Sequence, residues 1–214
     1  MFCRVYLVRH GETEWNATRR LQGASDVRLS DRGKEQAARL AKRLAGEKID
    51  GFYSSDLSRA LETAQILAEP HGLQVSQKAG LRELSFGPWE GMTIEEMETK
   101  ASWSLIDWFR NPVDTFIPGG EKLSDVFRRC DLAMEQIIKK HNDETIVVVA
   151  HGGSIRCIIC SALGVNPSEM WRIVIENTGL CRIDYPKSGK GFIKIINDYS
   201  HLDDSCITVH TSPR

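Results

Sequence analysis

The chain has 214 residues, of which 41% are hydrophobic and 27% charged, with 28 lysines and arginines against 29 aspartates and glutamates. This composition excludes a disordered chain and offers no general basic surface for nucleic acid or an anionic membrane. The length suits one hydrophobic core, so we expect a single domain over residues 1–214. The sequence contains neither the long apolar run of a membrane helix nor a signal-peptide pattern, so we expect a cytoplasmic protein with no membrane and no nucleic-acid partner.

Strand and helix patterns alternate along the first third of the chain. The apolar run Cys3–Val8 predicts a buried strand. Ser30 precedes apolar residues at helical spacing that end before Gly46, which predicts an amphipathic helix. The same spacing begins again at Leu57 and ends before Pro70, which predicts a second helix. Two further strands are predicted at Ile49–Tyr53 and Leu73–Ser76.

Residues 77–122 are rich in aromatic side chains and in glycine and proline breakers. We expect a mostly helical cap insertion here. Phe86 and Trp89 either pack within the cap or line the mouth of a substrate pocket. Three further aromatic residues are expected to pack the cap onto the sheet, namely Trp103, Trp108 and Phe109.

The second half of the chain repeats the alternation. The pattern predicts a helix over Lys122–His141, a strand at Thr145–Ala150 and a helix that ends at Leu163. The tail 203–214 lacks apolar periodicity and is expected to be loosely held. Strands that alternate with helices predict an α/β fold, with three α/β/α layers around a mostly parallel sheet. The last two strand candidates are Cys181–Tyr185 and Phe192–Ile196.

A histidine and a glycine follow each of two predicted strands, as His10-Gly11 and as His151-Gly152. Ligands of parallel sheets bind beyond the carboxyl ends of the strands, so the two pairs are expected at one site. Arg9 adds a guanidinium, whose fork matches phosphate oxygens. A lone histidine at a strand end is more often structural, but this combination favours a phosphate site.

Cys157-Ile158-Ile159-Cys160 spells C-x-x-C, a spacing found in zinc and redox sites. The two cysteines lie three residues apart in a predicted helix and therefore share one face. The sequence contains no second C-x-x-C to complete a zinc site. We therefore expect both cysteines to pack in the core as small hydrophobic residues.

The string Leu7–Asn16 resembles the signature of the histidine phosphatase superfamily, in its phosphoglycerate-mutase-like branch, and the motifs recur over roughly residues 4–200. The resemblance implies a phosphoglycerate-mutase-like fold and a transient phosphohistidine on His10. It assigns catalytic roles to Arg9, His10, Arg59, Glu83 (as proton donor) and His151. It assigns substrate-binding roles to Arg9, His10, Asn16, Gln22, Gly23, Arg59, Glu83, His151 and Gly152.

Glu83 allows a second interpretation, in which it is a surface glutamate paired with its neighbour Arg82. The family resemblance favours the catalytic one. Phosphoryl transfer depends on positioning and positive charge, which two arginines and an imidazole can supply. The sequence holds no aspartate-rich magnesium motif and no Walker loop, so we expect no metal and no cofactor.

The string Phe86–Gly91 resembles the FG-x-WEG pattern of the phosphatases in this family, and above all that of α-ribazole phosphatases and broad-specificity phosphatases. Pro118–Glu121 resembles another element of those phosphatases, although Lys122 stands where a serine is usual. The expected function is therefore a metal-independent phosphomonoesterase that hydrolyses α-ribazole 5'-phosphate, in cobalamin biosynthesis, or a broad range of phosphoesters. The alternatives are a cofactor-dependent phosphoglycerate mutase and a catalytically idle module that binds phosphate or docks a partner.

The expected partner is a small phosphorylated metabolite, and a homodimer through an edge strand or the cap is compatible with the sequence. Four arginines follow the first motif, and solvated surface or salt bridges are their default role. The alternative is that one of them meets a second anionic group of the substrate. These arginines are Arg19, Arg20, Arg28 and Arg32.

Overall fold

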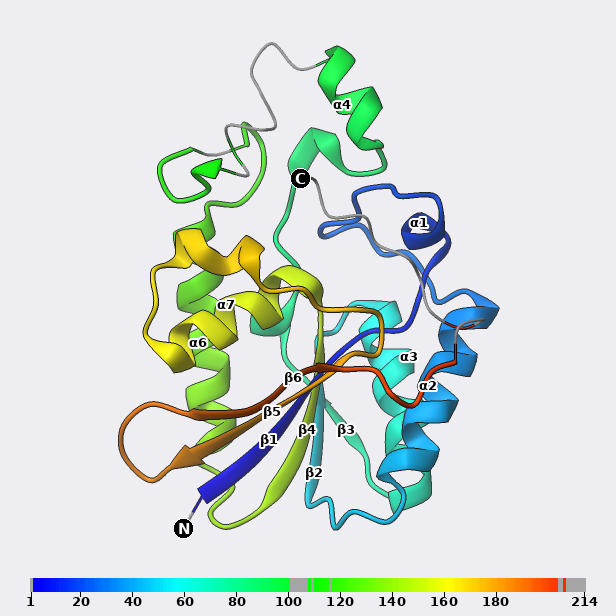
Figure 1. Ribbon diagram of the computed structural model, residues 1–214, viewed down its shortest axis with the longest axis vertical. Helices are drawn as coiled ribbons and strands as arrows, with labels where there is room; N and C mark the ends of the chain where they lie inside the picture. The colour runs from blue at the N-terminus through cyan, green and yellow to red at the C-terminus, as the bar shows by residue number, and fades with distance from the viewer. Residues whose placement is uncertain (1, 101–107, 109, 116, 204–205, 207–214) are drawn as a thin grey trace.

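A six-stranded sheet forms the middle of the molecule. Its strands in chain order are β1 (Phe2–Arg9), β2 (Gly51–Ser54), β3 (Val75–Gln77), β4 (Thr145–Ala150), β5 (Leu180–Pro186) and β6 (Phe192–Asp198). In space they follow the order β3-β2-β4-β1-β5-β6 (Figure 1). The first four pair in parallel, and β5 and β6 join through antiparallel pairs. The expected α/β fold with a mostly parallel sheet is confirmed.

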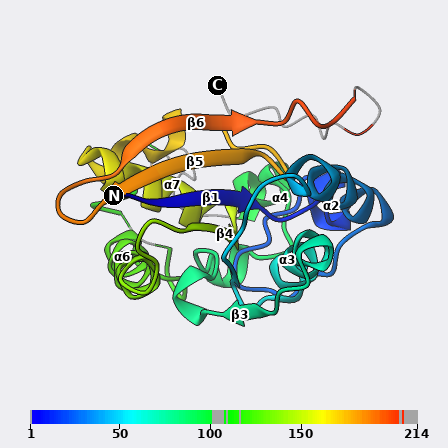
Figure 2. The ribbon, with the colours of Figure 1, turned by 90° about the horizontal axis from the view of Figure 1, so that it is seen from below.

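The computed structural model describes residues 2–100, 108, 110–115, 117–203 and 206. Figures 1 and 2 show α2 (Asp31–Leu44) and α3 (Ser58–Ala68) together on one side of the sheet, and α6 (Leu123–Ile138) and α7 (Gly152–Leu163) on the other. The remaining helices are α1 (Glu14–Ala17), α4 (Ile94–Lys100) and the 3-10 turns η1 (Glu69–His71), η2 (Ala79–Leu81), η3 (Gly87–Trp89) and η4 (Pro167–Arg172).

The two faces of the sheet bury separate apolar clusters. Along β4, Ile146 and Val148 pack in the cluster with α6 and α7, whereas Val147 and Val149 pack in the cluster with α2 and α3. All four side chains are fully buried. Side chains alternate between the faces of a strand, so a run of five or six apolar residues supplies both clusters at once.

Residues 77–122 contain short helical elements, η2, η3 and α4, among irregular segments in the part that the structure describes. Trp108 is buried and makes edge-to-face contacts with Phe86 and Trp171, at centroid distances of 5.6 and 5.4 Å. This confirms its expected packing role. Trp103 and Phe109, the other two aromatic residues expected to pack the cap, lie outside the described residues.

Only Asp203 and Cys206 of the tail are described, and α2 holds both. Asp203 pairs with Arg39 at 2.6 Å, and the carbonyl of Cys206 accepts a hydrogen bond from Gln36 at 2.7 Å. The rest of the tail lies outside the described residues. Among the described residues, no helix is both long and apolar enough to cross a bilayer.

All six cysteines are buried and none forms a disulfide bond, including Cys157 and Cys160 in α7. The expectation that these two pack in the core is confirmed. Burial raises the pKa of both thiols, and it raises the pKa of Cys3 and Cys130 to about 12.

Candidate active site

The two histidines of the His-Gly pairs meet at the carboxyl ends of β1 and β4. The two strands are adjacent and parallel, with Arg9 opposite Ala150, so His10 and His151 leave the sheet side by side. Their ring centroids lie 5.1 Å apart. The expected convergence of the two pairs is therefore what the fold produces.

The surroundings of His10 fix its tautomer. Its Nδ1 lies 2.7 Å from the carbonyl oxygen of Gly11. A carbonyl only accepts hydrogen bonds, so Nδ1 carries the proton and the lone pair belongs to Nε2. Asn177 donates to the carbonyl of His10 at 3.0 Å and to Oδ1 of Asn16 at 3.2 Å, which ties the two predicted site residues together.

Arg59, which is buried, and Arg9, which is half-buried, bring two guanidinium groups to the site. Arg59 donates to the carbonyls of Ser25 and Gly23, each at 2.7 Å, and Arg9 donates to the carbonyl of Ile175 at 2.7 Å. The buried Nε of each has no hydrogen-bond partner among the described residues. Burial lowers the pKa of both groups to about 10, so both remain cationic at neutral pH.

His151 is completely buried. Burial lowers its pKa well below the usual value, and the positive charge of Arg59 acts in the same direction. Its ring is therefore neutral at physiological pH. Neither ring nitrogen has a hydrogen-bond partner among the described residues.

The carboxylate of Glu83 lies at the N-terminus of α7. It accepts hydrogen bonds from the backbone nitrogens of Gly153 at 2.9 Å, Ser154 at 3.2 Å and Leu84 at 2.9 Å. A helix N-terminus attracts anions, so the backbone itself orients this side chain. The interpretation of Glu83 as a partner of Arg82 is wrong.

Arg82 pairs instead with Asp56, through two hydrogen bonds of 2.7 and 2.6 Å. The two carboxylates therefore divide the available partners, Asp56 taking the guanidinium and Glu83 the backbone nitrogens.

Arg129 and Glu121 hold the backbone around Glu83. Arg129 makes a two-pronged ion pair with Glu121, at 2.7 and 2.9 Å. The same guanidinium donates to the carbonyls of Gly80, Arg82 and Glu83 at 2.9, 2.6 and 3.0 Å. Sequence reasoning missed Arg129, because nothing in its helical pattern distinguishes it from a solvated arginine.

Glu90 holds the loop that carries Gln22 and Gly23. Its carboxylate accepts from the backbone nitrogens of Ala24 and Phe86, both at 3.0 Å. Gly23 has φ +56°, and a Cβ added there would lie 2.3 Å from Oε1 of Glu90. Glycine is therefore required by both backbone conformation and space. The carbonyl of Gly23 then holds Arg59 in place.

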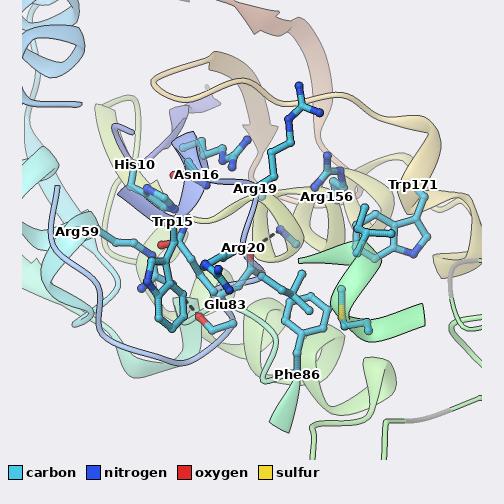
Figure 3. A pocket seen from close by; sticks show the side chains of 18 of the residues that line it. His10, Trp15, Asn16, Arg19, Arg20, Arg59, Glu83, Phe86, Arg156 and Trp171 are labelled. Atoms are coloured by element: carbon cyan, nitrogen blue, oxygen red, sulfur yellow. Dashed lines mark hydrogen bonds between the residues drawn. The ribbon is translucent and has the colours of Figure 1, made fainter. Parts of the chain in front are cut away.

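These elements enclose a cavity of about 310 Å³, shown in Figure 3. Every predicted site residue lines it except His151, whose buried ring packs against that of His10. Phe86 also lines the cavity, whereas Trp89 packs in the core. The lining residues that sequence reasoning did not assign to the site are Trp15, Leu21, Ile94, Glu95, Met97, Gly153, Arg156 and Trp171.

Of the four arginines after the first motif, Arg19 and Arg20 line the cavity. Arg20 donates to the carbonyl of Gly91 at 2.6 Å and pairs with Glu96 at 3.0 Å. Arg28 is exposed and Arg32 pairs with Glu12 at 3.5 Å. Within the described part of the chain, no group of three or more histidine, cysteine, aspartate or glutamate side chains is arranged to hold a metal ion.

The chain is similar to a known family and to several known proteins over most of its length. The family model of the histidine phosphatase superfamily (branch 1) matches residues 5–198. Phosphoserine phosphatase 1 of Hydrogenobacter thermophilus is 35% identical over 207 residues, covering 97% of this chain and 98% of that protein. Phosphoglycerate mutase-like protein 4 of Arabidopsis thaliana is 41% identical over 207 residues, covering 95% and 89%.

A solved structure from Escherichia coli K-12, named "putative alpha-ribazole-5'-P phosphatase", superimposes with a TM-score of 0.84. It is 25% identical, and the match covers 92% of this chain and 97% of that one.

Proposed function

The chain belongs to branch 1 of the histidine phosphatase superfamily, and from this membership we propose that it is a metal-independent phosphomonoesterase acting through a phosphohistidine. One observation carries the proposal. A single cavity joins the Nε2 lone pair of His10, the guanidinium groups of Arg9 and Arg59, and the carboxyl group of Glu83. These are a nucleophile, a cationic cradle for the phosphoryl oxygens, and a proton carrier.

In the first step, Nε2 of His10 attacks phosphorus and the ester P–O bond breaks. Glu83 acts as the general acid and gives a proton to the departing alkoxide, so an alcohol leaves. Charge on the phosphoryl oxygens is met by the two arginines, whose burial in a low-dielectric site strengthens each interaction. Neutral His151 contributes a ring N–H donor rather than a further charge.

In the second step, the carboxylate of Glu83 takes a proton from water as the water oxygen attacks the phosphohistidine. The P–N bond breaks, His10 recovers its lone pair, and inorganic phosphate leaves. The backbone around Gly23 and Gly152 lines the phosphoryl end of the cavity with Asn16 and Gln22. Close approach of backbone to the phosphoryl group needs glycine at such positions.

Two natural substrates have support from the relatives. α-Ribazole 5'-phosphate, an intermediate of cobalamin biosynthesis, is suggested by the Escherichia coli protein, and phosphoserine by the Hydrogenobacter protein. The aromatic side chains of Trp15, Phe86 and Trp171 in the cavity wall favour a substrate with a ring, such as α-ribazole 5'-phosphate. The arginines of the cavity favour a substrate with a carboxylate, such as phosphoserine.

A cofactor-dependent phosphoglycerate mutase is the second candidate, and the 41% identity to the Arabidopsis mutase-like protein supports it. A mutase returns the phosphoryl group to the substrate and must keep water away from the phosphohistidine, whereas a phosphatase must admit water. The two functions therefore differ in whether phosphate is released.

The test is steady-state turnover of four phosphoesters in EDTA, with and without 2,3-bisphosphoglycerate. The panel is α-ribazole 5'-phosphate, phosphoserine, 3-phosphoglycerate and p-nitrophenyl phosphate. Phosphate release without metal supports the phosphatase, with His10→Ala as the inactive control. Isomerisation of 3-phosphoglycerate without phosphate release supports the mutase. Inactivity toward every ester contradicts both proposals.

A further inference from the structure

We propose that Arg156 binds a second anionic group of the substrate, a carboxylate close to the ester oxygen, and thereby selects small phosphorylated acids. The inference rests on the proposed phosphatase function and adds the class of leaving group. None of the motifs of the chain points to this residue, because it lies in the interior of α7 among apolar neighbours.

The structure holds the guanidinium of Arg156 in one orientation. Its Nε donates to the carbonyl of Ile173 at 2.6 Å, and its Cζ lies 5.3 Å from the ring centroid of Trp171. These contacts fix the plane of the group. A preorganised fork loses less conformational entropy on binding a planar anion than a flexible side chain does.

The two Nη groups of Arg156 make no hydrogen bond to any described residue, although the side chain lines the cavity. The side chain is half-buried in the wall of the cavity, and burial lowers the pKa of this guanidinium. The carboxylates nearby are Glu83 and Glu176, and both interact with it through space. Glu83 is held by backbone nitrogens, and Glu176 interacts with Arg156 only through space. An incoming anion can therefore accept hydrogen bonds from the Nη groups.

The position of Arg156 limits the length of the leaving group. A Cβ added at Gly152 would lie 2.9 Å from Nη1 of Arg156 and 3.7 Å from Nε of Arg9. The second anionic group must therefore be only a few bonds from the phosphoryl group. Three-carbon acids phosphorylated on the terminal oxygen, such as phosphoserine and 3-phosphoglycerate, have this spacing.

Arg156 lies apart from His10 and Arg59 but next to Gly152 and Arg9, so an anion bound to it would sit at the edge of the phosphoryl end. In Figure 3, His10 and Arg59 occupy one side of the cavity, and Arg156 stands beside Trp171 on the other. The apolar side chains of Ile94 and Met97 also line this cavity. A carboxylate that pairs with Arg156 there is shielded from water, which strengthens the pair.

The test compares L-phosphoserine with O-phosphoethanolamine, which differ only in the carboxylate. We expect wild type to prefer phosphoserine by about 30-fold in kcat/KM. Arg156→Met should lose about 30-fold on phosphoserine and less than about threefold on phosphoethanolamine and p-nitrophenyl phosphate. Arg156→Lys should recover part of the preference. Arg128→Met, on the exposed side of α6, is the matched control and should behave as wild type.

Two results would overturn the inference. An equal loss on both esters would assign Arg156 to the phosphoryl group, and a wild type without preference would show that no carboxylate subsite exists. If wild type hydrolyses no ester at all, the proposed function fails instead. Calorimetric binding of the same two esters to His10→Ala, with and without Arg156→Met, then decides the subsite separately. Retained p-nitrophenyl phosphate activity or thermal unfolding verifies that each variant is folded.

Discussion

The carboxylate of Glu83 accepts a hydrogen bond from the backbone nitrogen of Gly153 at 2.9 Å, two residues after His151. The N-terminus of α7, which directly follows His151, therefore orients Glu83, the proposed proton carrier. Glu83 and Gly153 are 70 residues apart in the sequence, yet the N-terminus of α7 brings them into contact. A displacement of the N-terminus of α7 or of the Glu83 backbone should therefore slow proton transfer more than it weakens phosphate binding.

Gly153→Ala should disturb this contact directly. The added Cβ would lie 2.3 Å from Oε1 of Glu83, so the carboxylate must move. A displacement of about 1 Å at a catalytic group lowers kcat by about 100-fold. Steady-state kinetics on an alkyl phosphate measures the effect. Gly46→Ala is the control, because a Cβ there meets no atom within 4 Å, and a normal rate for Gly153→Ala would contradict the role of the contact.

Glu83→Gln should affect substrates according to their leaving groups. An alkoxide needs a proton as it departs, whereas p-nitrophenolate does not. We expect kcat on phosphoserine to fall by about 100-fold or more, and kcat on p-nitrophenyl phosphate to fall by less than about tenfold. The readout is the ratio of the two rate constants, and an unchanged ratio would remove the acid role from Glu83.

His10→Ala should lower turnover by at least about a thousandfold, because the nucleophile is lost. Rapid quenching at alkaline pH of the wild type with a radiolabelled ester should trap an acid-labile phosphoenzyme that the variant lacks. Near-ultraviolet circular dichroism should show an unchanged fold. A correctly folded variant with wild-type activity would refute the assignment of the nucleophile.

Arg129→Met should both destabilise the protein and slow it. The substitution removes the ion-pair partner of Glu121 and three hydrogen bonds to the backbone around Glu83. Breaking such a half-buried pair costs about 2–3 kcal/mol in the free energy of unfolding. We expect kcat on phosphoserine to fall by about tenfold with little change in KM. Urea unfolding and kinetics measure the two effects, and a change in KM alone would refute a positioning role.

His201 should make stability fall as the pH is lowered. Its Nε2 lies 3.0 Å from Oγ1 of Thr178, and burial lowers its pKa from 6.5 to about 4. Between these values the unfolded chain binds more protons than the folded one, so stability rises with pH. Allowing for partial solvent exposure, we expect a loss of about 1–2 kcal/mol between pH 7 and pH 4 from this group.

The corresponding measurement is urea unfolding across that range for wild type and His201→Gln. The variant should have the shallower pH dependence of the two. Identical slopes would show that the buried ring does not control acid stability.

Most of the fold was predictable because its signals are local. The run Thr145–Ala150 is identical with β4, since only a strand buried on both faces has such a continuous β-branched run. Ser30 caps α2 by accepting a hydrogen bond from the backbone nitrogen of Gly33, as its position before the apolar periodicity indicates. By contrast, α1 and η4 were not predicted, because four to six residues are too few to show a helical period.

The candidate site likewise contains residues that the sequence predicted and residues that it did not. His10 and His151 directly follow strands that the sequence predicts. Because these strands are parallel neighbours, the two histidines lie close together. Asn177 and Arg129 act through backbone carbonyls distant in sequence, and their own neighbours give no hint of it. Glu83 required the family resemblance, because its immediate neighbour Arg82 suggested an ion pair that Asp56 takes instead.

The burial of all six cysteine thiols affects how sensitive this protein is to oxidation. Peroxide attacks thiolates, and a thiol such as Cys130, with its pKa raised to about 12, is almost entirely protonated at neutral pH. The proposed nucleophile is a ring nitrogen, which forms no sulfenic acid. Under oxidative stress, the proposed phosphatase activity would therefore be retained, whereas phosphatases that depend on a reactive cysteine would be inactivated.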